Sequence, residues 1–138
     1  MGFKTYLISY FVSLFVFLGI DAFWLTIVAQ KMYTKYLGSL MKENPNLVAA
    51  LIFYVLYPVG IAVFAVVPAL REQLPARALF LGGLLGLLAY SAYDLTNLAT
   101  LKDWPVFITV VDIAWGTVLT GAVAIISYFI LNTFIKTF

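Results

Sequence analysis

Four long runs of apolar residues dominate the chain, and short polar segments separate them. The runs lie at about residues 6–28, 47–70, 78–101 and 106–131. Each is long enough to cross a bilayer core of about 30 Å. Because lipid offers the backbone no hydrogen-bond partners, each run is expected to be a transmembrane helix.

The links between these runs predict how the helices follow one another. Residues 71–77 and 102–105 are short links, so the helices that they join must run antiparallel. We therefore predict an all-α polytopic membrane protein. It is a single integral membrane domain over residues 1–138, an up-down-up-down four-helix bundle with both termini on one side. Lys and Arg are spread evenly over the two sides, which leaves the membrane orientation undetermined.

The longest link, between the first and second runs, has a helical pattern of its own. Apolar residues recur there at helical spacing while basic residues fall between them, which predicts a short amphipathic helix in the membrane interface. The apolar set is Tyr33, Tyr36, Leu37, Leu40 and Met41, and the basic set is Lys31, Lys35 and Lys42. This helix is either a surface anchor or a lid over whatever lies beneath it.

Two sequence signals predict where helices begin. Asn44 followed by Pro45 predicts an N-cap with proline at the first helical position of the second span. Asp103 is a candidate N-cap for the fourth span, with Pro105 in its first turn.

Composition narrows the function classes. Sixty-four per cent of the residues are hydrophobic and 10% are charged, against about 45–50% and about 25% in ordinary globular chains. These values exclude a soluble domain, a disordered chain and a nucleic-acid binder, so the expected partner is the lipid bilayer. The net charge of +2 is too small to indicate an electrostatic partner.

The absence of two residue types limits the chemistry further. The chain has no Cys and no His. Disulfides, thiolate metal sites and a Cys nucleophile are therefore excluded, and the usual near-neutral proton shuttle is missing. Any catalysis must use Asp, Glu, Lys, Tyr, Ser or Thr.

Three of the six acidic residues fall inside predicted spans: Asp21, Asp94 and Asp112. Each costs about 2.5–3.5 kcal/mol near a helix centre, and acids within a membrane are functional candidates by default. All three lie about two helical turns from the same end of the bundle, roughly 10 Å below one surface. We therefore predict that they converge in one pocket.

Polar and aromatic neighbours extend this acidic layer. Tyr90, Asp94 and Asn97 share one helix face, and Tyr93 and Tyr54 lie at similar depth. The pattern predicts a carboxylate- and tyrosine-lined chamber.

Three further side chains accompany the acids. Asp21 and Asp112 each precede a tryptophan by three residues, Trp24 and Trp115. An indole at that spacing can separate its acid from lipid and donate its N–H. Lys102 follows Asp94 closely enough to reach down as a partner for the carboxylate.

Small residues mark the other half of the bundle. Gly82 and Gly86 form a GxxxG pair, and Thr117 and Gly121 offer a second face of the same kind. Such faces predict close helix packing, within one chain or between copies.

The acids admit four interpretations. In the first, the acids lock the bundle by hydrogen bonds across helices; in the second, they bind a proton or cation. In the third, they act on a lipid, and in the fourth, they belong to a docking face for a larger complex. If a metal is bound, Asp21, Asp94 and Asp112 are the candidate ligands, and Mg²⁺ accepts oxygen ligands alone. No catalytic residue and no cofactor is otherwise indicated.

The run from Tyr93 to Trp104, together with Asp21-x-x-Trp24 and Asp112-x-x-Trp115, resembles a known family over nearly the whole chain. That family comprises small predicted bacterial membrane proteins and is catalogued as domain of unknown function 2177. The resemblance implies four spans in a bacterial inner membrane and implies no activity.

We therefore favour a protein that binds or translocates a proton or a small cation, as a homodimer. The alternatives are a membrane enzyme acting on a lipid or isoprenoid, and a non-catalytic subunit of a larger membrane complex.

Overall fold

The computed structural model describes residues 2–135, and most of these are helical, with no strand among them. The elements are α1 (Phe3–Phe23), the π-helical turn η1 (Trp24–Val28), α2 (Gln30–Leu37), the 3₁₀ turn η2 (Gly38–Leu40), α3 (Leu47–Ile61), the π-helical segment η3 (Ala62–Val66), α4 (Val67–Glu72), α5 (Pro75–Thr100) and α6 (Val106–Ile135). Four continuous helical stretches are long and apolar enough to cross a membrane: Phe3–Val28, Leu47–Glu72, Pro75–Thr100 and Val106–Ile135. The four helices predicted from the sequence are thereby confirmed.

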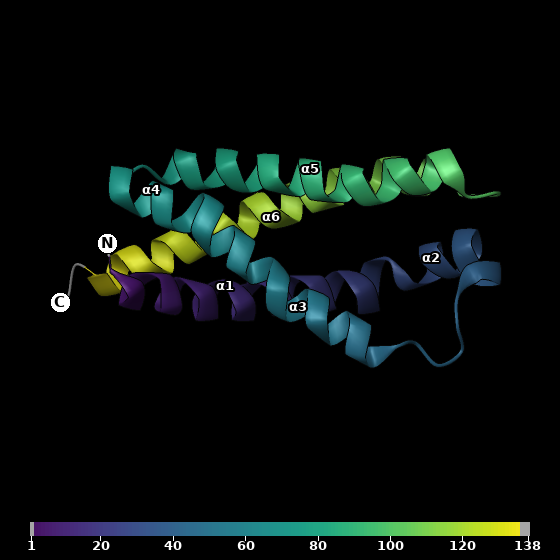
Figure 1. Ribbon diagram of the computed structural model, residues 1–138, viewed down its shortest axis with the longest axis horizontal. Helices are drawn as coiled ribbons and strands as arrows, with labels where there is room; N and C mark the ends of the chain where they lie inside the picture. The colour runs from purple at the N-terminus through teal and green to yellow at the C-terminus, as the bar shows by residue number, and fades with distance from the viewer. Residues whose placement is uncertain (1, 136–138) are drawn as a thin grey trace.

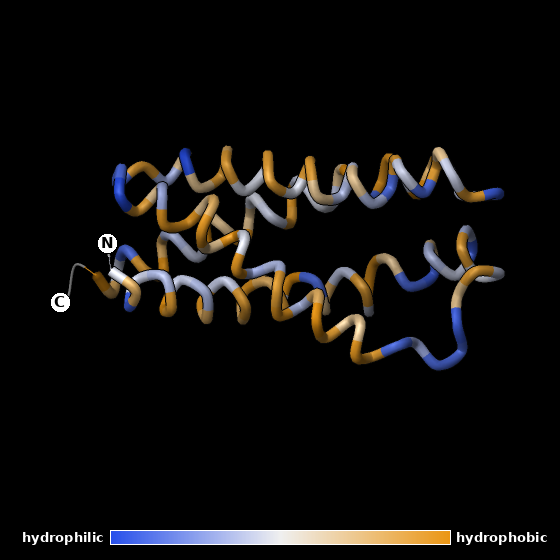
Figure 2. Tube along the Cα trace, viewed as in Figure 1, coloured by the Kyte–Doolittle hydropathy of each residue, from blue (hydrophilic) through white to orange (hydrophobic). Residues whose placement is uncertain are grey.

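Consecutive long helices run in opposite directions, and the two ends of the chain lie at one end of the molecule (Figure 1). The short helix α2 lies at the other end, beside the loop that leads into α3. The trace coloured by hydropathy is mostly orange along the four long helices, with blue gathered at their ends and in the connections (Figure 2). This distribution suits helices whose outer surfaces face lipid.

Helices α5 and α6 form the tightest packing in the molecule. Ala78, Gly82 and Gly86 repeat every fourth residue along the buried face of α5. A Cβ atom at Gly82 would lie 2.7 Å from the carbonyl oxygen of Thr120, and one at Gly86 would overlap the carbonyl oxygen of Gly116. The GxxxG pair therefore brings two helices of the same chain into backbone contact.

The second predicted small-residue face takes part in the same packing. A Cβ atom at Gly121 would lie 3.2 Å from the carbonyl oxygen of Leu79 on α5. Thr117 lies beside Gly83 and donates its hydroxyl to the carbonyl of Ile113 at 2.8 Å. Both helices thus contribute small residues to one interface.

The hydrophobic core lies in the half of the bundle that holds the chain ends. It joins side chains of α1, α3, η3, α4, α5 and α6: Phe17, Ile61, Ala65, Val66, Ala69, Leu70, Ala78, Leu119, Val123, Ala124, Tyr128 and Leu131. At the opposite end α3 diverges from α5, as Figure 1 shows. The three aspartates inside the spans, Asp21, Asp94 and Asp112, occupy that more open end.

Two predicted helix starts are wrong. The second span begins at Leu47, and its cap is Asn46 rather than Asn44, because the Asn46 side chain accepts a hydrogen bond from the Ala49 N–H at 3.1 Å. Asp103 does not cap the fourth span. It occupies a left-handed turn with φ of 61°, and α6 begins at Val106, after Pro105.

The glycine contacts give a first prediction. Gly86→Ala should lower the free energy of unfolding by about 1–3 kcal/mol, because the new methyl group must force α5 and α6 apart. Gly83→Ala is the matched control, since its Cβ atom would be 3.8 Å from the nearest Thr117 atom. Denaturant unfolding in detergent micelles measures both. Equal stability of the two variants would contradict the packing described here.

Candidate functional site

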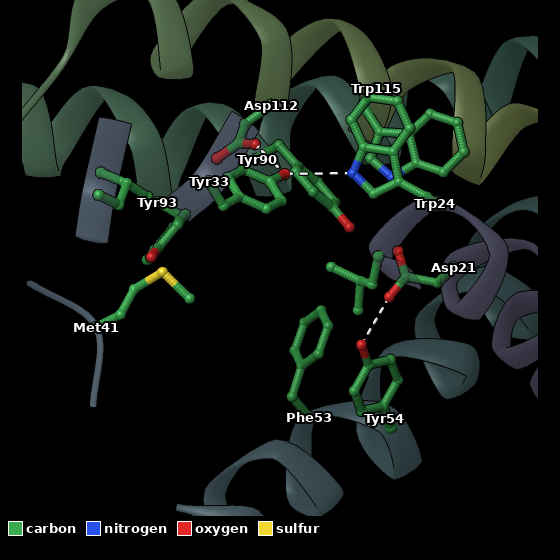
Figure 3. A pocket seen from close by; sticks show the side chains of 12 residues that line it. Asp21, Trp24, Tyr33, Met41, Phe53, Tyr54, Tyr90, Tyr93, Asp112 and Trp115 are labelled. Carbon is green, nitrogen blue, oxygen red and sulfur yellow. Dashed lines mark hydrogen bonds between the residues drawn. The ribbon is translucent and has the colours of Figure 1, made fainter. Parts of the chain in front are cut away.

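A cavity of about 400 Å³ lies at the open end of the bundle, beneath α2 (Figure 3). Side chains from six helical elements and the loop after η2 line it: Asp21, Trp24, Leu25, Tyr33, Leu37, Met41, Phe53, Tyr54, Tyr90, Tyr93, Asp112 and Trp115. We call this cavity the acidic chamber. It brings together seven of the ten site residues predicted from the sequence.

Asp112 is held by a side chain of α2. The Tyr33 hydroxyl donates to Oδ1 of Asp112 at 2.5 Å and accepts from the indole N–H of Trp24 at 3.3 Å. Burial and, secondarily, the bond to Asp112 raise the pKa of Tyr33 above its ordinary value of 10.0. Tyr33 therefore stays protonated throughout the neutral range and remains a donor to the carboxylate. This bond joins α2 to α6 across the top of the chamber.

Asp21 meets a different tyrosine on the other side of the chamber. The Tyr54 hydroxyl donates to Oδ2 of Asp21 at 2.7 Å. Both Asp21 and Asp112 are 7% exposed, and Figure 3 shows them on opposite sides of the chamber. A charge-assisted hydrogen bond of this kind is roughly twice as strong as a neutral one. Each carboxylate is thus fixed by a phenol from a neighbouring helix.

Asp94 does not join Asp21 and Asp112 in one pocket as predicted. It is fully buried and is absent from the chamber lining. Asp112 on α6 is close enough for the charges of the two carboxyl groups to influence each other, and neither oxygen of Asp94 has a hydrogen-bond donor. Two ionised carboxylates are acceptors only, so no hydrogen bond can join them unless one carries a proton.

The two tryptophans predicted beside the acids stack on one another. The rings of Trp24 and Trp115 are 4.2 Å apart between centroids and 9° from parallel. They line the chamber and also a shallower apolar cavity outside it, so the pair forms a wall between the two. The prediction that their N–H groups serve the acids is wrong: Trp24 donates to Tyr33, and the N–H of Trp115 is buried without a partner.

Two predicted site residues lie away from the chamber. Asn97 is half-buried and lies beside Tyr93 on the next turn of α5. Lys102 is exposed in the α5–α6 turn. Within residues 2–135 the one ion pair joins Arg77 and Glu72 at 3.4 Å, so the predicted pairing of Lys102 with Asp94 is wrong.

The acids do not form a metal site of the predicted kind. No three acidic side chains in the part of the chain that the structure describes are grouped so that they could hold one ion. Asp21 accepts a hydrogen bond from Tyr54 and Asp112 accepts one from Tyr33, while Asp94 does not line the chamber. A shared three-aspartate ligand set is therefore not what this fold builds.

A second, apolar cavity of about 480 Å³ adjoins the chamber between α3 and α5. Its lining is Phe53, Ala89, Tyr90 and Tyr93. Three of these also line the acidic chamber. We call this second cavity the apolar groove. Sequence reasoning did not identify Phe53 and Ala89 as site residues, because their only signal is an ordinary apolar side chain in a span.

The comparison with protein families agrees with this architecture. The family model described as "Predicted membrane protein (DUF2177)" matches residues 6–129. The chain belongs to this family. The matched segment includes the three buried aspartates, the acidic chamber and the apolar groove. No match is found among curated proteins or among solved structures.

The Tyr33 bond gives a test of how α2 is held in this DUF2177 member. Tyr33→Phe removes a hydrogen bond to a charged group, worth about 1.5–3 kcal/mol. Amide hydrogen exchange over Gln30–Leu37 should therefore accelerate by roughly tenfold to a hundredfold.

The matched control is Tyr36→Phe on the same helix. The Tyr36 ring packs against Phe107 at 4.8 Å, and phenylalanine keeps that contact. Equal exchange rates in the two variants would show that the hydroxyl of Tyr33 does not hold α2 in place.

Proposed function

We propose that the protein binds a proton, or a small cation in its place, at the Asp94–Asp112 pair and translocates it across a bacterial inner membrane. One observation carries the proposal. Asp94 is fully buried, lies close enough to Asp112 for their charges to interact, and receives no hydrogen bond to either oxygen. A buried carboxylate in that position needs a positive charge.

The energetics favour an added proton over two bare carboxylates. Two unit charges about 4 Å apart repel by about 4 kcal/mol at an effective dielectric constant of 20, and burial of each ion costs several kcal/mol more. Among residues 2–135 no Lys or Arg lines the chamber, and Lys102 is exposed. One proton shared between the two carboxyl groups removes the repulsion and supplies the missing donor.

The geometry favours a proton over a multivalent metal ion. Calcium takes six to eight oxygen ligands and magnesium demands an octahedron, whereas the described part of the chain offers no three-acid group. Tyr33 already uses Oδ1 of Asp112, which leaves the second oxygen for the shared proton. Asp112 also lines the chamber, so it connects the buried Asp94 to the cavity.

Infrared spectroscopy at neutral pH tests the shared proton. The protein should show one protonated carboxyl band that Asp94→Asn removes, because an amide donates to Asp112 without titrating. The exposed Asp103 in its left-handed turn supplies the control, and Asp103→Asn should leave the band intact. The absence of the band in the parent protein would refute the proposed site.

Translocation also requires groups that can pass a proton through the packed half of the bundle. Ser9, Ser13, Thr120 and Ser127 are fully buried there, and the serine hydroxyls have no hydrogen-bond partners. Thr120 shares a 2.7 Å hydrogen bond with Tyr57. Buried hydroxyls without partners cost free energy, so a purely structural interior would favour alanine at the serine positions.

Replacing the buried serines tests whether their hydroxyl groups carry protons or have only a structural role. The triple variant Ser9→Ala, Ser13→Ala, Ser127→Ala should unfold at a higher temperature, because three unpartnered buried hydroxyls are removed. If the hydroxyls carry protons, the same variant should lose proton flux into liposomes loaded with a pH-sensitive dye. Raised stability with undiminished flux would exclude this route.

A lipid-modifying enzyme is the second candidate, and the apolar groove beside the acids favours it. In that case Asp21 or Asp112 would act as general acid or base on a lipid lying in the groove. The two functions differ in outcome, since an enzyme releases a changed lipid and a translocator does not. Mass spectrometry of lipids incubated with the purified protein distinguishes them.

A further inference from the structure

We infer that the acidic chamber and the apolar groove together bind an amphipathic organic ammonium ion with a single hydrocarbon chain. This inference rests on the proposed function in treating the chamber as a cation site. It goes further by naming the class of cation and by assigning it to Asp21 and the aromatic lining, apart from the Asp94–Asp112 pair.

The charge of the lining selects a cation. Asp21 and Asp112 both line the chamber, and no Lys or Arg in the described part of the chain does. A phosphate or carboxylate headgroup would meet two like charges there and no compensating donor of positive charge. Asp21 binds Tyr54 through Oδ2, and its carboxylate is the acid of the chamber that is not paired with a second carboxyl group.

The aromatic content selects an organic cation. Seven of the twelve lining residues are aromatic, and ring faces attract ammonium groups, most strongly where water is excluded. The volume of about 400 Å³ lies in the range of small-molecule pockets, about 300–1,000 Å³. It far exceeds what a proton or a bare metal ion fills. Aromatic rings around a carboxylate form the recognition chemistry of substituted ammonium groups.

The apolar groove gives the hydrocarbon chain its place. It shares Phe53, Tyr90 and Tyr93 with the chamber and continues along Ala89 between α3 and α5. Phe53 is 45% exposed and Tyr93 57% exposed, so the lining extends to the outer surface of these apolar helices. An amphiphile can therefore place its charged end near Asp21 while its chain lies toward the lipid.

The test uses decyltrimethylammonium as the probe, with the full-length protein in an uncharged maltoside detergent. Calorimetric titration should show saturable binding after subtraction of protein-free micelles. Tetramethylammonium, which lacks the chain, should bind at least about tenfold more weakly. Decyl sulfate, which has the chain and the opposite charge, should not bind. Saturable binding of decyl sulfate with similar affinity would overturn the inference.

Two variants divide the site into its parts. Asp21→Asn should weaken decyltrimethylammonium binding by at least about tenfold, while Asp103→Asn, on an exposed turn residue, should not change it. Ala89→Phe fills the groove and should weaken the decyl compound but leave tetramethylammonium unchanged. Ala99→Phe, on an exposed face of the same helix, is its control. Unchanged affinity in both Asp21→Asn and Ala89→Phe would overturn the inference.

The ligand-binding experiment and the infrared test of the Asp94–Asp112 proton can succeed or fail independently. A carboxyl band that depends on Asp94, without binding of decyltrimethylammonium, overturns the ligand class and supports the proton site. Binding that depends on Asp21, with no such band, supports the ligand class and overturns the proton site.

Discussion

The backbone contact between α5 and α6 is the constraint on which the rest of the structure depends. At Gly82 and Gly86 the α6 backbone leaves no room for a side chain on α5, and Gly116 leaves space on α6 for the ring of Tyr90. The axes therefore come together at a separation that a larger residue would prevent. Further along the same seam the stripe on α5 changes from glycine to Asp94, and that on α6 from Gly116 to Asp112. The helix pair that packs most tightly is therefore also the pair that carries the buried Asp94 and Asp112.

The molecule divides its tasks between its two ends. The end that holds both chain ends contains the apolar core around Phe17, Ile61 and Leu119, which stabilises the bundle. At the other end α3 diverges from α5, and the space between the helices becomes the acidic chamber and the apolar groove. A bundle packed equally well along its whole length would have no cavity. The apolar core and the two cavities therefore lie in different parts of the same four helices.

The sequence predicts well how deep each aspartate lies along its helix, and poorly which way its side chain points. Counting residues from the helix ends places Asp21, Asp94 and Asp112 at one level, because the rise per residue is constant. It does not tell which way a side chain points, since helix rotation is set by neighbouring helices. Hence Asp94 is buried outside the chamber lining, and Lys102 is exposed at the surface. The bond from Tyr33 to Asp112 spans 79 residues, and no local pattern encodes it.

The stacked indoles of Trp24 and Trp115 have a consequence beyond forming a wall. Two identical chromophores 4.2 Å apart and 9° from parallel share their excited states, because their transition dipoles couple strongly at that separation. One indole lies at the end of the first span and the other in the last, so this coupling exists only while the two spans are assembled. The near-ultraviolet circular dichroism of the protein is therefore an intrinsic optical signature of its tertiary structure at the site itself.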